Sequence, residues 1–129
     1  MAEALLIHRL AGKNIKVTSA GVAPLAGHPA DPLAQLVMLQ HGLDISAHRA
    51  QHATQALMTG MDVILTLEQF HSNWIHSRFP HLQGRVHKLG RWQNNLDIAD
   101  PYRMPQEAFE TAFIEIEKCV ADWAERLVK

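Results

Sequence analysis

Two runs of apolar residues predict the central elements of the chain. Residues 62–67 read Asp-Val-Ile-Leu-Thr-Leu, a continuous apolar run that is typical of a strand covered on both faces of a parallel sheet. After Pro105, apolar residues recur every three or four positions, which predicts a long helix with one buried face. That face comprises Phe109, Ala112, Phe113, Ile116, Cys119, Val120, Trp123 and Leu127. We therefore expect 62–67 to be a central strand and the chain from Pro105 to be the last helix.

Helical and strand patterns alternate through the rest of the chain. The predicted helices cover residues 1–10, 32–41, 55–58 and 68–78, and the predicted strands cover residues 15–19 and 86–89. The second helix has the clearest start, because Asp31 is a good N-cap and Pro32 suits the first helical position. The alternation predicts an α/β fold, a three-layer sandwich with a mainly parallel sheet, in a single domain over residues 1–129.

Composition excludes several classes of partner. Twelve basic and 13 acidic residues give a formal charge of −1 with no basic run, so the chain lacks the electrostatic signature of a nucleic-acid binder. A single cysteine excludes an intramolecular disulfide and fits a reducing cytoplasm. No apolar run approaches the ~18 residues of a membrane span, and no signal-peptide pattern opens the chain. We expect a cytoplasmic protein that binds neither membranes nor nucleic acid.

The segment Asp97–Tyr102 carries the most suggestive chemistry. It places a carboxylate, a ring-locked turn and an aromatic side by side at Asp100, Pro101 and Tyr102. Such a group can donate a proton to a leaving group while the aromatic ring holds a flat substrate. A site of this kind also requires a nucleophile.

Five motifs, in this order, resemble the bacterial branch of the low-molecular-weight protein tyrosine phosphatases. They are Met1–Leu6, Ser19–Gly21, Gly27–Pro32, His41–Ser46 and Asp97–Tyr102. The resemblance runs from the first residue to the last helix. It implies hydrolysis of phosphotyrosine in proteins, without a metal or other cofactor. An arsenate reductase on the same fold is a related alternative.

In that family a strand and a Cys-x5-Arg-Ser/Thr loop precede a Pro-Met-Ala-Glu helix start, and this sequence begins at that methionine. The resemblance therefore implies that the first strand and the phosphate loop are absent from this chain. The loop's thiolate is the nucleophile, its N–H groups cradle the phosphate, and its arginine clamps two oxygens. We expect the chain to be catalytically inactive. A start codon further upstream, with an in-frame Cys-x5-Arg, is a third explanation.

Cys119 does not replace that nucleophile. It is followed by Arg126, one position too far for Cys-x5-Arg, and Glu125 occupies the required place. Cys119 also lies on the apolar face of the last helix, where a buried thiol keeps a high pKa and is inert.

By the resemblance, Asp100 is the general acid and Tyr102 the aromatic wall of the phosphotyrosine slot. Asp97 is the weaker candidate acid and is better explained as a turn residue, and Arg103 is a charge on the rim. Without a nucleophile, Asp100 would be a solvated loop carboxylate.

Ser19 and His48 match family positions that support the phosphate loop. Without that loop, we expect a strand-end serine and an ordinary histidine. The family tends to have His-Arg-Ala-Arg here, whereas this chain ends that motif with Gln51, which removes a positive charge.

Nine histidines raise the question of a metal site. His48 and His52 are four apart, but no third ligand follows at a recognisable spacing. His71, His76 and His81 recur every five residues, which does not keep them on one helical face. We expect no metal site.

The resemblance also places the absent strand between residues 15–19 and 63–67, in a sheet of order 2-1-3-4. Three outcomes are open: direct pairing of these two segments, pairing with a second copy, or partial disorder of the first helix and strand. We expect a homodimer or higher oligomer, because exposed sheet edges promote association. A non-catalytic binding or scaffold module is the alternative function.

Overall fold

The computed structural model describes residues 1–22 and 26–128. Its elements in chain order are α1 (Ala2–Arg9), α2 (Pro32–Gln40), α3 (Gln55–Thr59), β1 (Ile64–Thr66), α4 (Gln69–Arg78), the 3-10 helix η1 (Pro80–Arg85), β2 (Val86–Lys88) and α5 (Gln106–Leu127). Every predicted helix is present within a few residues of its expected bounds. The predicted N-cap of α2 is confirmed, since the Asp31 carboxylate accepts a hydrogen bond from Leu33 N at 2.8 Å.

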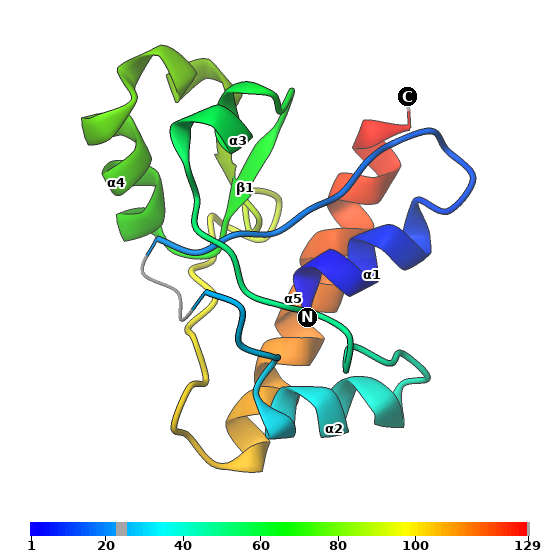
Figure 1. Ribbon diagram of the computed structural model, residues 1–129. Helices are drawn as coiled ribbons and strands as arrows, with labels where there is room; N and C mark the ends of the chain where they lie inside the picture. The colour runs from blue at the N-terminus through cyan, green and yellow to red at the C-terminus, as the bar shows by residue number, and fades with distance from the viewer. Residues whose placement is uncertain (23–25, 129) are drawn as a thin grey trace.

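Three layers build the molecule, as the sequence predicts (Figure 1). Strands β1 and β2 pair in parallel, with Ile64 opposite Val86 and Thr66 opposite Lys88. Helices α1, α2 and α5 lie on one side of this sheet, and α4 and η1 lie on the other. The fold is α/β with a parallel sheet.

Successive residues of β1 face the two layers in turn, as strand geometry requires. Leu65 packs against the larger hydrophobic cluster, which contains the buried faces of α1, α2 and α5. Ile64 packs against a smaller cluster around Met58, Ile75, Leu82 and Val86. The sheet therefore separates two hydrophobic cores.

The final helix carries the larger core, and its predicted apolar face is confirmed. Seven of the eight predicted residues are buried and Leu127 is half-buried; Ala124 joins them. The Trp123 indole donates to the Leu89 carbonyl at 2.9 Å, which satisfies the polar atom of a buried aromatic. This bond ties α5 to the end of β2.

The predicted strand at 15–19 is not a strand within the described residues. Ile15 and Val17 are half-buried against the larger core, but no backbone hydrogen bond joins residues 15–18 to another part of the described chain. Alternation of apolar residues fixes which face is buried, but a strand also needs a neighbouring backbone. Only Gly21 pairs, in an isolated parallel bridge to His52. Direct pairing of 15–19 with β1 does not occur.

The prediction that 62–67 is a central strand is also wrong for the described part of the chain, where the sheet has two strands. β1 is shorter than expected, and Val63 is 36% exposed. Leu89 N donates to the Thr66 carbonyl, so Thr66 faces β2. Because residues of a parallel strand alternate between its two sides, the N–H and C=O of Leu65 face away from β2. Among the described residues that edge of β1 has no partner strand.

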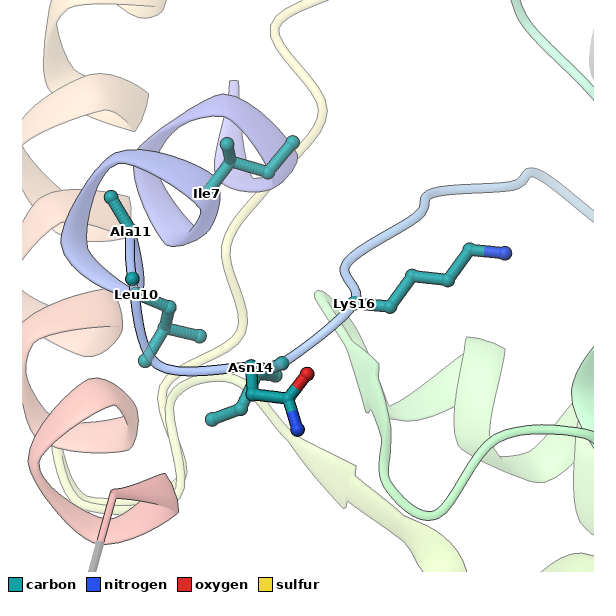
Figure 2. Close-up of a pocket in the computed structure, with 7 residues that line it drawn as sticks. Ile7, Leu10, Ala11, Asn14 and Lys16 are labelled. Atoms are coloured by element: carbon teal, nitrogen blue, oxygen red, sulfur yellow. The ribbon is translucent and has the colours of Figure 1, made fainter.

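A hollow of about 370 Å³ lies between the end of α1 and the segment that follows it (Figure 2). Ile7, Leu10, Ala11 and Ile15 supply its apolar lining, and Ile7 is 49% exposed. Apolar surface is thus open to solvent beside the unpaired segment 15–18.

A closed loop connects β2 to the stretch that carries Asp100. Leu96 N donates to the Gly90 carbonyl at 3.2 Å, which brings the two ends of the loop together. A side chain on Gly90 would collide with the Leu96 backbone, so only glycine fits. Of the described helices, none is long and apolar enough to cross a membrane.

Candidate active site

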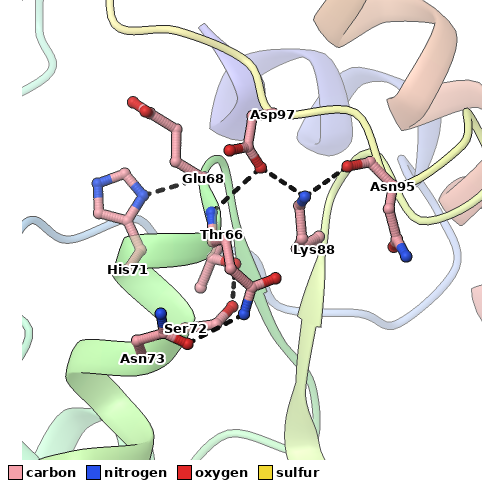
Figure 3. Close-up of polar contacts among 9 residues, drawn as sticks. Thr66, Glu68, His71, Ser72, Asn73, Lys88, Asn95 and Asp97 are labelled. Atoms are coloured by element: carbon pink, nitrogen blue, oxygen red, sulfur yellow. Dashed lines mark hydrogen bonds and ion pairs between the residues drawn. The ribbon is translucent and has the colours of Figure 1, made fainter.

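The segment 97–102 is anchored at its start by backbone and side-chain bonds (Figure 3). Ile98 is buried, and its N–H donates to the Leu67 carbonyl at 2.9 Å, just beyond β1. The Asp97 carboxylate accepts from Gln69 N at 3.1 Å and pairs with the Lys88 ammonium at 2.5 Å. Asp97 therefore joins the end of β2 to the first turn of α4, where a negative charge is favoured.

The pKa of Asp97 is lowered, chiefly by the hydrogen bond from Lys88. Lys88 also donates to the Asn95 carbonyl and has a nearly buried side chain. Asp97 is thus held as a carboxylate anion and cannot readily donate a proton. Asp97 has a larger anchoring role than the simple turn residue that the sequence predicted, and the assignment of Asp100 as the general acid stays a prediction.

Asp100 and Tyr102 lie together at the exposed tip of the segment. The Asp100 carboxylate accepts a hydrogen bond from Tyr102 N at 3.0 Å, a local turn that asparagine and aspartate favour. Pro101 restricts the backbone between them, and Met104 N donates to the Pro101 carbonyl at 2.8 Å. The carboxylate and the 55%-exposed Tyr102 ring are therefore presented to solvent on a constrained turn.

Arg103 is attached to the same tip. Its guanidinium lies 5.2 Å from the centre of the Tyr102 ring, and its backbone adopts φ +63°. This cation–π contact orients the ring and keeps a positive charge beside it. The prediction of a rim charge at Arg103 fits this position.

Ser19 lies at the end of the extended segment 15–18. Its carbonyl accepts a hydrogen bond from the Gln51 side chain at 2.8 Å. A backbone hydrogen bond from Gly21 N to the Gln51 carbonyl, at 2.9 Å, lies close to this contact. Gln51 therefore holds Ser19 by a neutral hydrogen bond.

His48 pairs with the first helix. Its Nδ1 lies 3.3 Å from the Glu3 carboxylate, and both side chains are partly exposed. This contact joins the loop before α3 to the first turn of α1. Within the described residues, no hydrogen bond connects Ser19 or His48 to the Asp97–Tyr102 segment.

Cys119 is buried in the larger core with 0% of its surface exposed. Burial raises the pKa of its thiol, and Asp122 and Glu115 raise it further. A protonated thiol without solvent access is neither a nucleophile nor a metal ligand.

No group of three or more histidine, cysteine or acidic side chains is close enough to hold a metal ion in residues 1–22 and 26–128. The histidines instead have separate roles. His71 Nδ1 accepts from Glu68 N at 3.2 Å in a capping box that begins α4, and His41 stacks on Phe113.

Sequence reasoning missed Lys88 and Glu3. Lys88 pairs with Asp97 because the loop between them is closed. Glu3 pairs with His48, which is distant in the chain. The position of Lys88 at the carboxyl end of a strand was the one available signal, because parallel strands present functional groups at that end.

The family model described as low molecular weight phosphotyrosine protein phosphatase matches residues 1–129. The chain belongs to this phosphatase family. A probable low molecular weight protein-tyrosine-phosphatase, EpsP, from Ralstonia nicotianae is 45% identical over 127 residues, which are 98% of this chain and 86% of EpsP.

Solved phosphatases have the same fold. The structure of Vibrio vulnificus Wzb in complex with benzylphosphonate superimposes with a TM-score of 0.91 at 34% identity, covering 97% of this chain and 87% of Wzb. The YwlE arginine phosphatase from Geobacillus stearothermophilus has a TM-score of 0.90 at 28% identity, covering 98% of this chain and 82% of YwlE. The α/β family fold predicted from the sequence is confirmed.

Proposed function

We propose that residues 1–129 carry the proton-donating half of a phosphotyrosine phosphatase site. Asp100 is the general acid, and Tyr102 is the wall against which the substrate ring lies. The observation that supports this most directly is the constrained, solvent-facing turn that holds the Asp100 carboxylate beside the Tyr102 ring. Benzylphosphonate, bound to the related Wzb, has the aromatic and phosphoryl parts that such a pair would contact.

We further propose that a polypeptide of residues 1–129 does not by itself hydrolyse phosphate esters. Covalent phosphoryl transfer needs a thiolate that substrate can reach. The one cysteine, Cys119, is buried in the core and the pKa of its thiol is raised, so it is unreactive. Arsenate reduction would need a reachable thiolate too.

Ser19 and His48 would support a phosphate loop only if one were supplied from outside these residues. Their contacts to Gln51 and Glu3 serve the fold in either case. The proposed substrates are phosphotyrosine proteins in the cytoplasm. The proposed reaction uses no cofactor. The single cysteine is consistent with that reducing compartment.

The test is turnover of p-nitrophenyl phosphate by a polypeptide of residues 1–129. We expect no rate above buffer, and no change in Asp100→Ala or Cys119→Ser. Turnover that Asp100→Ala abolishes would show that a nucleophile exists and would refute inactivity. A phosphoarginine peptide is a useful contrast, because an arginine phosphatase shares the fold.

A second role, as a self-associating scaffold module, is favoured by the unpaired backbone. The outer edge of β1 and residues 15–18 both lack hydrogen-bond partners among the described residues. Exposed apolar residues lie nearby at Ile7 and Val63. Open edges of this kind template strand pairing, so we propose a homodimer or a higher assembly in which a second copy covers them.

Sedimentation velocity from low to high micromolar concentration tests the assembly. Ile7→Glu should shift the population toward monomer, because it places a charge on the exposed apolar rim. Ile114→Glu is the matched control, since Ile114 is a similarly exposed isoleucine on α5 (54% against 49%). A compact monomer at high micromolar concentration would contradict the assembly.

A further inference from the structure

Three consecutive residues at the start of α4 hold the segment that carries the candidate acid. The Leu67 carbonyl accepts a hydrogen bond from Ile98 N at 2.9 Å, and Gln69 N donates to the Asp97 carboxylate at 3.1 Å. Glu68 lies between these two anchors and is the N-cap of α4. The backbone conformation at Glu68 therefore sets how both anchors face the segment.

A histidine completes the capping box at Glu68. The Glu68 carboxylate accepts from His71 N, and His71 Nδ1 accepts from Glu68 N at 3.2 Å (Figure 3). Glutamate or glutamine is the usual residue at the position of His71, and neither changes its charge near neutral pH. Histidine differs, because an imidazole gains its proton between about pH 8 and pH 5.

Protonation of His71 is incompatible with this hydrogen bond. An imidazolium donates from both ring nitrogens and accepts at neither, so Nδ1 would face the Glu68 N–H as a second donor. The ring would then turn to a carboxylate. The carboxylates of Glu68 and Asp97 each already accept a backbone N–H of this turn, from His71 and Gln69 respectively. The imidazolium therefore competes with the bonds that anchor the segment.

Asp97 and His71 are close enough to interact. The pKa of Asp97 is lowered first by the hydrogen bond from Lys88 and, less strongly, by the charge of His71. The titratable groups on α4 beyond His71 and on the elements packed against it are all basic: His76 and Arg78 on α4, His81 and Arg85 on η1, and His87 and Lys88 on β2. β1 has none. No carboxylate on these elements draws the His71 ring away from Glu68 and Asp97.

We propose that His71 is a positioning residue of the candidate active site: its neutral ring holds the start of α4 against the segment 97–102, and its protonation loosens that hold. The proposal rests on the proposed role of Asp100 on this segment and adds a dependence on pH. The proton-donating turn is held most firmly near neutral pH and less firmly in acid.

Amide hydrogen exchange of the 129-residue protein tests the proposal at about pH 7.5 and about pH 5.5, near the two ends of the range in which imidazoles titrate. The Glu68 and Ile98 amides should lose protection about threefold to tenfold at the lower pH, after correction for intrinsic rates. That factor corresponds to the loss of one hydrogen bond. Asp97 stays ionised at both values, because its pKa is lowered from 3.8.

His71→Gln is the decisive variant, because glutamine accepts from Glu68 N but does not titrate. It should be equally protected at both pH values. His71→Phe keeps a ring without an acceptor and should be poorly protected at both. His81→Gln is the matched control: His81 is an exposed histidine on the adjacent η1, so the drop in protection should be unchanged.

NMR of the ring nitrogens gives an independent check. At the higher pH His71 should carry its proton on Nε2, as an accepting Nδ1 requires. A proton on Nδ1 would overturn the proposal, as would a drop in protection that persists in His71→Gln or is absent from the parent. If His71→Phe does not fold, His71→Gln and the position of the proton still decide.

Neither readout uses turnover of a phosphate ester. A result against His71 therefore leaves the assignment of Asp100 as it stands. Loss of that assignment, in turn, leaves the pH effect on the segment measurable.

Discussion

The segments 97–102 and 15–19 are both irregular backbone beside the same sheet, but they are held in opposite ways. The first makes its own contacts: Asp97 bonds to Gln69 and Lys88, and Asp100 bonds to Tyr102 N. The second buries apolar side chains, but the backbone of residues 15–18 has no hydrogen-bond partner among the described residues. Side-chain acceptors can fix a loop locally, whereas an extended segment depends on a neighbour. The turn at Asp100 is therefore held by contacts within the described chain, whereas the backbone of residues 15–18 is not.

The largest expected difference is in core stability. Ile98→Ala should lower the free energy of unfolding by about 2–5 kcal/mol, because Ile98 is fully buried. Ile15→Ala, the same substitution at a half-buried site, should cost about 1 kcal/mol. Urea denaturation of both variants measures the difference. Equal losses would show that the segment 15–19 is as firmly packed as the segment 97–102.

Hydrogen exchange tests the same contrast at the backbone. The Ile98 amide donates to the Leu67 carbonyl, whereas the Val17 amide has no partner in the described chain. The Ile98 amide should exchange at least roughly a hundredfold more slowly than the Val17 amide, after correction for intrinsic rates. If the Val17 amide is comparably protected only at high protein concentration, that result would indicate pairing with a second copy. Comparable protection in dilute monomer would contradict the contrast.

The ion pair of Asp97 predicts a pH dependence. Its folded pKa is lowered below the ordinary value of 3.8, so Asp97 contributes stability above about pH 4 that is lost as pH falls through the folded pKa. Lys88→Met removes the main cause of the lowered pKa. The variant should lose less stability than the parent between pH 5 and 3, a range that spans the ordinary Asp value of 3.8. Parallel urea titrations across this range check it, and identical pH profiles would refute the role of Lys88.

The smallest effect is expected at Gln51. Gln51→Ala removes the hydrogen bond to the Ser19 carbonyl at an exposed position, so the unfolding free energy should fall by about 0.5 kcal/mol. Amide exchange at Gly21 should accelerate, because Gly21 donates to the Gln51 backbone nearby. Gln51→Arg, which adds a positive charge at this position, is the informative companion variant. A loss well above 1 kcal/mol would mean that Ser19 is held far more tightly than an exposed bond allows.

The helices and the family fold were predictable from sequence because their signals are local. Asp31 and Pro32 indicate the start of α2, and apolar residues that recur every three or four positions predict α5. The strand at 15–19 failed because alternation cannot show whether a partner backbone is present. The roles of Asp100 and Tyr102 came from the resemblance, and their turn is consistent with them. The pairing of Lys88 with Asp97 was out of reach, since it requires the loop between them to close.

That closure at Gly90 and Leu96 makes the intervening loop an insertion point. Its tip contains Asn94 and Asn95, both with positive φ (57° and 55°), and the hydrogen bond from Leu96 N to the Gly90 carbonyl holds its two ends together. A peptide tag placed between Asn94 and Asn95 would lengthen the tip without changing the distance from β2 to the segment 97–102. Affinity capture or a fluorescent label can therefore be introduced here while both termini remain untouched.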